Sequence, residues 1–261
     1  AVMGELISEN KLHADVMTAS GKTLGENLKG KRSSDLSVIA SCKKPVRENA
    51  GFLVISGNLF DSALMKTSVI SADFQKRFFS TPGKEGIFEA KAIVFEGPED
   101  YHDRINNPEL EIDDKSVLFI RGVGCVGYPG SAEVVNMLPP DKLVKEGINH
   151  LPTVGDGRQS GTSESPSILN ASPESVVGGG LAFLQTGDRV LLDLNKSEMN
   201  ALVPDEEWET RKKNWTAPEL VSHTPWEEIY RSHVGQLAEG GCLEMATKYQ
   251  KIRKTLSRDN H

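Results

Sequence analysis

Short apolar runs that follow one another closely place the strongest limit on how this chain can fold. Val, Ile, Leu and Phe gather in segments bounded by Gly, Pro, Asn or Asp, a pattern typical of β-strands. Such segments span residues 50–55, 86–95, 116–121, 151–154 and 189–194. Short helical patterns lie between some of them. This alternation favours a mixed α/β fold, with a β-barrel or sandwich flanked by α-helices, over a long doubly wound sheet.

Helix signals are clear at three places. A helix is predicted to begin at Pro98, because proline suits the first turn and the acids after it suit the positive end of the helix dipole. A second helix is predicted to begin after Ser131, a favourable N-cap residue. After residue 205 the density of charged residues rises and the pattern around Trp208 becomes helical.

Composition argues against several classes of function. The formal net charge of -7 disfavours broad nucleic-acid binding, which needs clustered Lys and Arg. Cys42, Cys125 and Cys242 show no CxxC spacing, so neither a disulfide framework nor a zinc site is indicated. Free thiols fit a reducing compartment, and we expect a cytoplasmic protein. No apolar run approaches the roughly 20 residues of a membrane span, and no secretory signal pattern is present.

Two glycine-rich loops follow predicted strands, at residues 122–130 and 155–161. Glycine lets the backbone turn sharply and lets its amides approach a ligand. The second loop continues into hydroxyl-bearing residues that include Ser160 and Thr162. Such a loop suits a small polyhydroxylated or anionic ligand. An ordinary polar surface turn is the alternative, but the apolar segments on both sides favour a position at the mouth of a core.

Glu133 and Ser160 are the candidates for chemistry near these loops. Glu133 is either a charge at the start of the predicted helix or, if it faces the second loop, a ligand for a divalent cation. One carboxylate does not hold Mg²⁺ alone, so further ligands must come from elsewhere. The Ser160 hydroxyl needs a cation or a dipole beside it to act as a base. A serine hydrolase is disfavoured, because the residues around Ser160 lack the Gly-x-Ser-x-Gly elbow.

Five blocks carry a resemblance to a known family. They are Gly57-Asn58-Leu59-Phe60-Asp61-Ser62-Ala63, Glu85-Gly86-Ile87-Phe88-Glu89, Ala92-Ile93-Val94-Phe95-Glu96, Tyr128-Pro129-Gly130-Ser131-Ala132-Glu133-Val134-Val135-Asn136-Met137 and Gly155-Asp156-Gly157-Arg158-Gln159-Ser160-Gly161-Thr162. These blocks resemble the dihydroxy-acid dehydratase and phosphogluconate dehydratase family. The run from Ser165 to Pro173 is most similar to its sugar-acid branch, the arabinonate and xylonate dehydratases. The resemblance covers nearly the whole chain.

The resemblance implies a hydro-lyase that converts a sugar acid (aldonate) to a 2-keto-3-deoxy acid. It implies an iron–sulfur cluster that acts as a Lewis acid on the departing hydroxyl and a Mg²⁺ ion that holds the carboxylate end of the substrate. It assigns the base that takes the C2 proton to Ser160, an assisting role to Thr162 and a Mg²⁺-ligand role to Glu133. It also implies a swivelling β-barrel domain flanked by α-helices.

The same resemblance predicts how the chain is organised. We expect residues 1–50 to form a linker and lead-in helix, 51–200 the β-barrel domain with the catalytic loops, and 201–261 a helical tail packed on that domain. Family members carry an N-terminal cluster domain that supplies the cluster cysteines and the other Mg²⁺ ligands. The implied partners are that domain, a small sugar-acid substrate and further copies of the chain in a dimer or tetramer.

Two functions remain open from the sequence. The first is a dehydratase domain that is inactive without its cluster domain. The alternative is a non-catalytic binding or interaction protein that has kept the dehydratase fold.

Overall fold

The computed structural model describes residues 1–46, 51–159 and 165–249. These residues fall into two compact units, and the larger one spans Gly51–Lys248. The smaller one combines Ala1–Ala50 with the stretch from Tyr249 onward, and it contains the helices α1 (Val2–Ser8) and α2 (Leu24–Leu28). A capping box starts α2, in which Thr23 Oγ1 accepts from Glu26 N and Thr23 N donates to Glu26 Oε2 at 2.7 Å.

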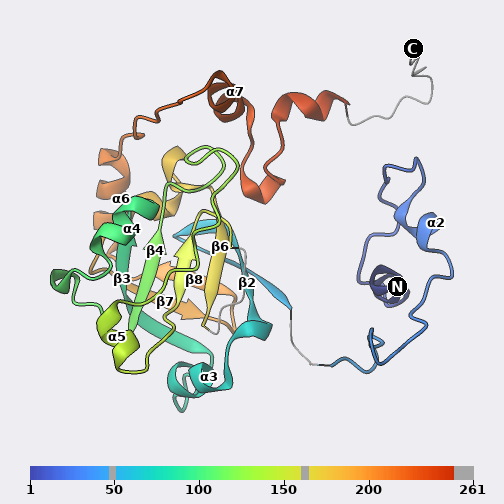
Figure 1. Ribbon diagram of the computed structural model, residues 1–261, viewed down its shortest axis with the longest axis horizontal. Helices are drawn as coiled ribbons and strands as arrows, with labels where there is room; N and C mark the ends of the chain where they lie inside the picture. Colours follow the sequence, from blue (N-terminus) through green and yellow to red (C-terminus); the bar gives the residue numbers. More distant parts are fainter. Residues whose placement is uncertain (47–50, 160–164, 250–261) are drawn as a thin grey trace. The chain divides into compact units, whose positions relative to one another are not determined.

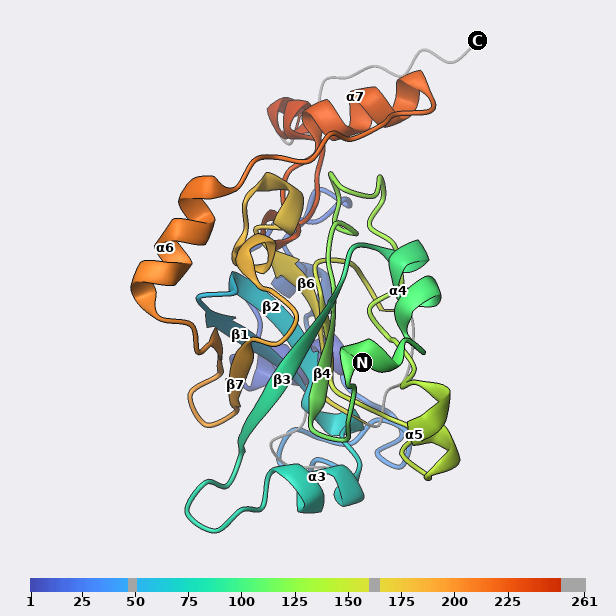
Figure 2. The same ribbon diagram turned by 90° about the vertical axis from the view of Figure 1, so that its left-hand side faces the viewer.

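The larger unit is built on a closed eight-stranded β-barrel (Figures 1 and 2). The strand order around the barrel is β1-β2-β6-β5-β4-β3-β7-β8. Strands β3 to β6 are parallel to one another, whereas β1–β2, β2–β6, β3–β7 and β7–β8 are antiparallel pairs. The strands are β1 (Phe52–Gly57), β2 (Phe60–Lys66), β3 (Ile87–Phe95), β4 (Ser116–Ile120), β5 (Thr153–Gly155), β6 (Ser167–Ser172), β7 (Arg189–Asp193) and β8 (Glu198–Ala201).

Alternate residues of the strands fill two separate cores. On β4, Val117 and Phe119 join the core inside the barrel, while Leu118 and Ile120 join a second core on its outer face. Both faces of β4 are therefore buried, which explains its continuous apolar sequence. Burial of a side chain such as Phe119 contributes about 1.5–3 kcal/mol. Every strand contributes to the inner core, through Ile55, Met65, Ala92, Phe119, Val154, Ile168, Leu192 and Met199.

Helices cover the outer core and one end of the barrel. The outer core lies beneath α4 (Pro98–Arg104) and α5 (Asp141–Lys145), which Figure 2 shows on the same side as β3 and β4. Tyr101 of α4 packs edge-on against Phe95 of β3, with ring centroids 5.4 Å apart. At one end of the barrel, α3 (Ala72–Phe78) places Phe74 and Phe78 against Phe88. The opposite end carries the loops that follow β4 and β6 (Figures 1 and 2).

From β8 to Lys248 the chain is part of the barrel unit. Helix α6 (Asp205–Asn214) has acids in its first turn and bases in its last, as the helix dipole favours. It is anchored by an ion pair of 2.6 Å between Arg211 and Asp188 and by Trp208, whose ring packs edge-on against Phe183. Helix α7 (Pro225–His233) follows, and then η5 (Leu237–Glu239). Two further short helices, η3 (Ser175–Val177) and η4 (Gly180–Phe183), lie between β6 and β7.

The predicted mixed α/β barrel flanked by helices is confirmed, and each of the five predicted strands overlaps an observed one. Strands β2, β6 and β8 had no prediction. The division of the chain into linker, barrel and tail stays a prediction. Among the described residues, the helices are all too short or too polar to cross a bilayer.

Candidate functional site

Four neighbouring parallel strands end at the same end of the barrel, and the residues that follow them form one polar network. These strands are β3, β4, β5 and β6. Loops at the carboxyl ends of parallel strands are the usual place for binding sites in barrels. Both glycine-rich loops predicted from the sequence begin here, after β4 and after β5. The residues that carry the network are Glu96, Arg121, Asp156, Glu174 and Ser175.

Asp156, directly after β5, holds the loop that follows β4. Its side chain is fully buried and accepts from Val123 N at 2.9 Å and from Gly122 N at 3.1 Å. It also accepts from both the backbone nitrogen and the hydroxyl of Ser175, at 2.9 and 2.7 Å. A buried carboxylate with four donors is satisfied, and its oxygens are occupied by the loops that it joins. Asp156 is therefore a residue that orders the loops.

Glu174, two residues after the end of β6, holds the next part of the same loop. Its carboxylate accepts from Val126 N at 2.9 Å and from Gly127 N at 2.8 Å. Burial raises the pKa of Glu174, and the backbone hydrogen bonds from Gly127 and Val126 oppose this rise. A side chain at Gly124 would collide with this carboxylate, since a Cβ there would lie 2.5 Å from Glu174 Oε2. Position 124 therefore requires glycine, because its backbone passes so close to the Glu174 carboxylate that a Cβ has no room.

Two residues of the C-terminal segment also stabilise the loop after β4 and the Glu174 side chain. Arg231 of α7 donates to the carbonyl oxygens of Val126 at 3.0 Å and of Gly127 at 3.3 Å. Gln236 donates to Glu174 Oε1 at 3.0 Å and accepts from Glu174 N at 2.8 Å. The loop after β4 is therefore held by two buried carboxylates, Asp156 and Glu174, and by Arg231 from far along the chain, while Gln236 holds Glu174 itself.

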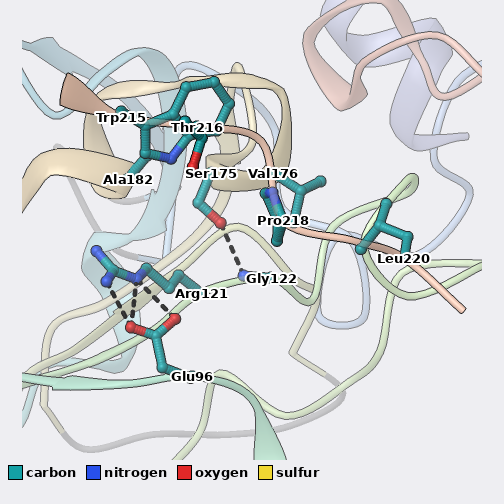
Figure 3. A pocket seen from close by; sticks show the side chains of 10 residues that line it. All are labelled: Glu96, Arg121, Gly122, Ser175, Val176, Ala182, Trp215, Thr216, Pro218 and Leu220. Carbon is teal, nitrogen blue, oxygen red and sulfur yellow. Dashed lines mark hydrogen bonds and ion pairs between the residues drawn. The ribbon is translucent and has the colours of Figure 1, made fainter. Parts of the chain in front are cut away.

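A cavity of about 340 Å³ opens beside this network, as Figure 3 shows. Arg121 and Glu96 form an ion pair on one wall, and Arg121 Nη1 also donates to the carbonyl oxygens of Leu181 and Leu184. Ser175 Oγ accepts from Gly122 N at 2.8 Å on the opposite wall. Trp215 and the residues after it complete the lining. The Arg121 guanidinium therefore links Glu96, directly after β3, to the η4 segment.

Glu133 lies beside the second glycine-rich loop, as one of the two sequence hypotheses required. Its Oε1 is 3.4 Å from Arg158 Nη1, and both side chains are about half exposed. Arg158 is further joined to this segment through Nε, which donates to Ser131 O at 2.8 Å, and through its backbone nitrogen, which donates to Ala132 O at 2.8 Å. Arg158 precedes Ser160 by two positions. Ser160 and Thr162 themselves lie outside the described residues.

The helix predicted to begin after Ser131 is absent, and this prediction is wrong. Residues 131–140 are irregular, and Ser131 has a φ of 61°. The backbone nitrogens of Ala132 and Val135 donate to Val123 O and Arg158 O, so they bond to neighbouring loops and not within a helix. Val135 and Met137, two positions apart, are both buried in the outer core. Tertiary hydrogen bonds and burial outweigh the local signal here, and Glu133 is not at a helix start.

The described residues do not by themselves fit a metal centre. Among them, no three His, Cys, Asp or Glu side chains converge. Cys42, Cys125 and Cys242 are free cysteines, and Cys125 is buried whereas Cys242 is exposed. Glu133 offers a single carboxylate that already faces a guanidinium. An iron–sulfur cluster or a complete Mg²⁺ site would need ligands from outside this part of the chain.

Sequence reasoning missed the residues that organise the site. Asp156, Glu174, Arg121 and Arg158 were not singled out, although three of them directly follow the strand ends or the glycine of a loop. A carboxylate immediately after a buried strand was the available signal for Asp156. Nothing local indicated Glu174, because its partners Val126 and Gln236 are distant in sequence.

A closed mixed β-barrel with an ordered polar network at the ends of four parallel strands defines the class of domain. The sequence profile of the dihydroxy-acid/6-phosphogluconate dehydratase C-terminal domain matches residues 37–242. The chain therefore belongs to the dihydroxy-acid/6-phosphogluconate dehydratase family and corresponds to the C-terminal part of its members.

Curated relatives cover the same region. A D-xylonate dehydratase of Caulobacter vibrioides is 56% identical over 261 residues, which is 100% of this chain and 44% of the relative. An L-arabinonate dehydratase of Rhizobium leguminosarum bv. trifolii is 31% identical over 93% of this chain and 40% of the relative. A dihydroxy-acid dehydratase of Clostridium beijerinckii is 35% identical over 94% of this chain and 42% of the relative. The chain thus spans less than half the length of these proteins.

Proposed function

We propose that this chain is the C-terminal domain of a sugar-acid dehydratase, which converts an aldonate to a 2-keto-3-deoxy acid. Family membership and the high identity to a D-xylonate dehydratase support the reaction class and the sugar-acid substrate. The contact between Glu133 and Arg158 is the observation that carries the assignment to this site. It brings the proposed metal ligand to the loop that leads into the proposed base.

Ser160 is the proposed base, and it takes the proton from C2 of the aldonate. The electron pair of that C–H bond forms the C2–C3 double bond as the bond between C3 and its hydroxyl oxygen breaks. The departing hydroxide takes up one proton, which balances the proton removed from C2, and leaves as water. The resulting enol tautomerises to the 2-keto-3-deoxy acid, so atoms and charge balance. Thr162 assists in the same loop. This chain supplies proton transfer and loop order, and assistance to the departing hydroxyl comes from outside the described residues.

The complete enzyme would contain an iron–sulfur cluster and Mg²⁺. We propose that Glu133 donates one carboxylate oxygen to Mg²⁺, an ion that prefers such hard ligands. The other ligands and the cluster would belong to an N-terminal cluster domain. Assembly as a homo-oligomer, a dimer or tetramer, and a cytoplasmic location stay predictions.

A reconstitution assay tests this function. The chain is assayed with D-xylonate and L-arabinonate, alone and after fusion behind the N-terminal part of the Caulobacter relative. We expect turnover only from the fusion, and we expect Ser160→Ala to abolish it without changing the cluster content. Ser163→Ala, in the same loop, is the matched control and should keep the wild-type rate. Turnover by the isolated chain, or a normal rate for Ser160→Ala, contradicts the proposal.

A further inference from the structure

The cavity at the carboxyl ends of β3 and β4 has one wall of charged groups (Figure 3). Arg121 Nε donates to both carboxylate oxygens of Glu96, at 3.0 and 2.9 Å. Arg121 Nη1 donates to the carbonyl oxygens of Leu181 and Leu184. The side chain of Arg121 is 19% exposed, whereas that of Glu96 is 60% exposed. Glu96 therefore presents a carboxylate that a guanidinium holds in place and that is still open to a ligand.

Trp215 and Thr216, which follow α6, bring hydrogen-bond donors to the same cavity. Figure 3 shows the indole nitrogen of Trp215 on the edge of the ring that faces Arg121. In the part of the chain that the structure describes, neither Trp215 Nε1 nor Thr216 Oγ1 has a protein partner. An indole N–H only donates, and a hydroxyl can donate or accept. The cavity thus offers a free donor together with a carboxylate that accepts.

Most of the remaining lining of the cavity is apolar. Its apolar surface comes from Val176, Ala182, Pro218 and Leu220. Arg121 and Glu96 are the charged residues of the lining, and their charges compensate each other. An anionic ligand would lie beside the exposed carboxylate, which repels it. A neutral ligand with hydroxyl groups on its rim and C–H groups on its faces fits this combination of groups.

The wall formed by the segment between α6 and α7 is already in place. Trp215 packs edge-on against Phe183, with ring centroids 6.2 Å apart. Further along, Arg231 donates to Val221 O at 2.6 Å and to Ser222 Oγ at 2.7 Å. A preformed site loses little conformational freedom when a ligand binds. The cavity volume of about 340 Å³ lies within the roughly 300–1,000 Å³ of small-molecule sites.

We propose that this cavity binds a neutral monosaccharide in its ring form. One ring hydroxyl donates to Glu96, a second accepts from Trp215 Nε1, and the C–H groups of the ring lie against the apolar wall. The hydrogen bond to Glu96 is charge-assisted, so it is the strongest polar contact. This binding activity goes beyond the proposed function, because it requires neither turnover nor a bound metal. Its test is therefore independent of the reconstitution assay.

The indole N–H signals in ¹H–¹⁵N NMR spectra of this chain report binding directly, since the chain has three tryptophans. D-xylose, L-arabinose and D-glucose are each titrated to about 50 mM. We expect at least one of them to shift the Trp215 signal with a Kd of about 1 mM, the scale of a small ligand held by a few hydrogen bonds. The signal of Trp226, which is 77% exposed on α7, should stay in place. No shift of Trp215 with any of the three sugars overturns the proposal, and so does an equal shift of Trp226.

Sodium D-xylonate tests the preference for a neutral ligand. At equal ionic strength it should shift the Trp215 signal with a Kd at least about tenfold higher than that of the sugar, because its carboxylate meets Glu96. Equal or tighter binding of D-xylonate at Trp215 overturns the assignment to a neutral sugar.

Two variants each remove one polar contact, and the backbone amide signal of Gly122, which also lines the cavity, follows binding in both. Glu96→Gln removes the charged acceptor and should raise Kd about tenfold. Trp215→Phe removes the donor and keeps an aromatic ring beside Phe183, and it should raise Kd about threefold to tenfold.

Each variant has a matched control outside the cavity. Glu89→Gln controls for the acceptor, because Glu89 also pairs with an arginine, Arg189, at 3.1 Å. Trp226→Phe controls for the donor. Both controls should keep the wild-type Kd. If Glu96→Gln does not fold, Trp215→Phe decides alone, and a wild-type Kd for every folded cavity variant overturns the proposal.

Discussion

Ser175 Oγ donates a 2.7 Å hydrogen bond to Asp156 Oδ2, and this contact joins the end of β5 to the start of η3. The same hydroxyl accepts from Gly122 N, so three loops meet at one pair of side chains. The site is therefore ordered by a buried carboxylate and a hydroxyl that bond to each other and to the loop after β4. Four predictions test how this end of the barrel is held together.

Asp156→Asn should destabilise the domain. The amide replaces one acceptor oxygen by a donor, which would face backbone nitrogens such as that of Val123. We expect the free energy of unfolding to fall by about 3 kcal/mol, measured by urea denaturation, since hydrogen bonds to charged groups are strong. Asp61→Asn, on an exposed residue of β2, should change it by about 0.5 kcal/mol or less. Equal stability of Asp156→Asn and wild type would show that the network does not hold the loops.

Gly157→Ala should push the loop that contains Gly157 away from the segments that contain Val123 and Ala132. The added methyl would meet Ala132 O at 2.7 Å, closer than real Cβ contacts, whereas at Gly235 the nearest atom would be 3.6 Å away. We expect a loss of about 1–3 kcal/mol for Gly157→Ala, the usual cost of overpacking. Gly235→Ala is the matched control and should stay near the wild type. The check is thermal unfolding of both variants, and a similar melting temperature for the two refutes the close-approach argument.

Glu174 should make the stability depend on pH. Burial raises the pKa of Glu174 above its ordinary value of 4.5, so the folded state binds this proton more tightly than the unfolded state. The stabilisation from this group is complete below pH 4.5 and is lost as the pH rises through the raised pKa. Glu174→Gln should remove the part of the pH dependence of the free energy of unfolding that comes from this group.

The measurement is the free energy of unfolding at several pH values from about 4 to 8, where carboxyl groups titrate. Glu146→Gln, on an exposed residue after α5, should keep the wild-type slope. If wild type and Glu174→Gln show parallel curves, the raised pKa of Glu174 is wrong.

Cys125 should resist alkylation. Burial raises the pKa of the Cys125 thiol above its ordinary value of 9.0, and the charge of Glu174 adds to this rise. Because the thiolate is the reactive form, iodoacetamide at pH 8 should modify exposed Cys242 at least about tenfold faster than Cys125, as followed by mass spectrometry. In denaturant the two rates should converge. Native Cys125 reacting as fast as Cys242 would contradict its burial.

Much of the barrel could be predicted from local patterns. The apolar run of β4 and the proline that starts α4 carry their structure in adjacent residues, since strand periodicity and helix capping are short-range effects. The glycine-rich loops were located for the same reason. Their role around Ser160 and Thr162 came from the family resemblance and stays a prediction.

The sequence by itself determined five of the eight barrel strands, the barrel class and the family, because these depend on short-range patterns and on long matching blocks. Only the tertiary structure decided that residues 131–140 form no helix and that Asp156 and Glu174 are buried loop anchors. The physical reason is that the hydrogen-bond partners of these residues come from distant parts of the sequence. Glu174 bonds to Val126 and Gln236, which lie 48 and 62 positions away, and no local propensity specifies a hydrogen bond at that separation.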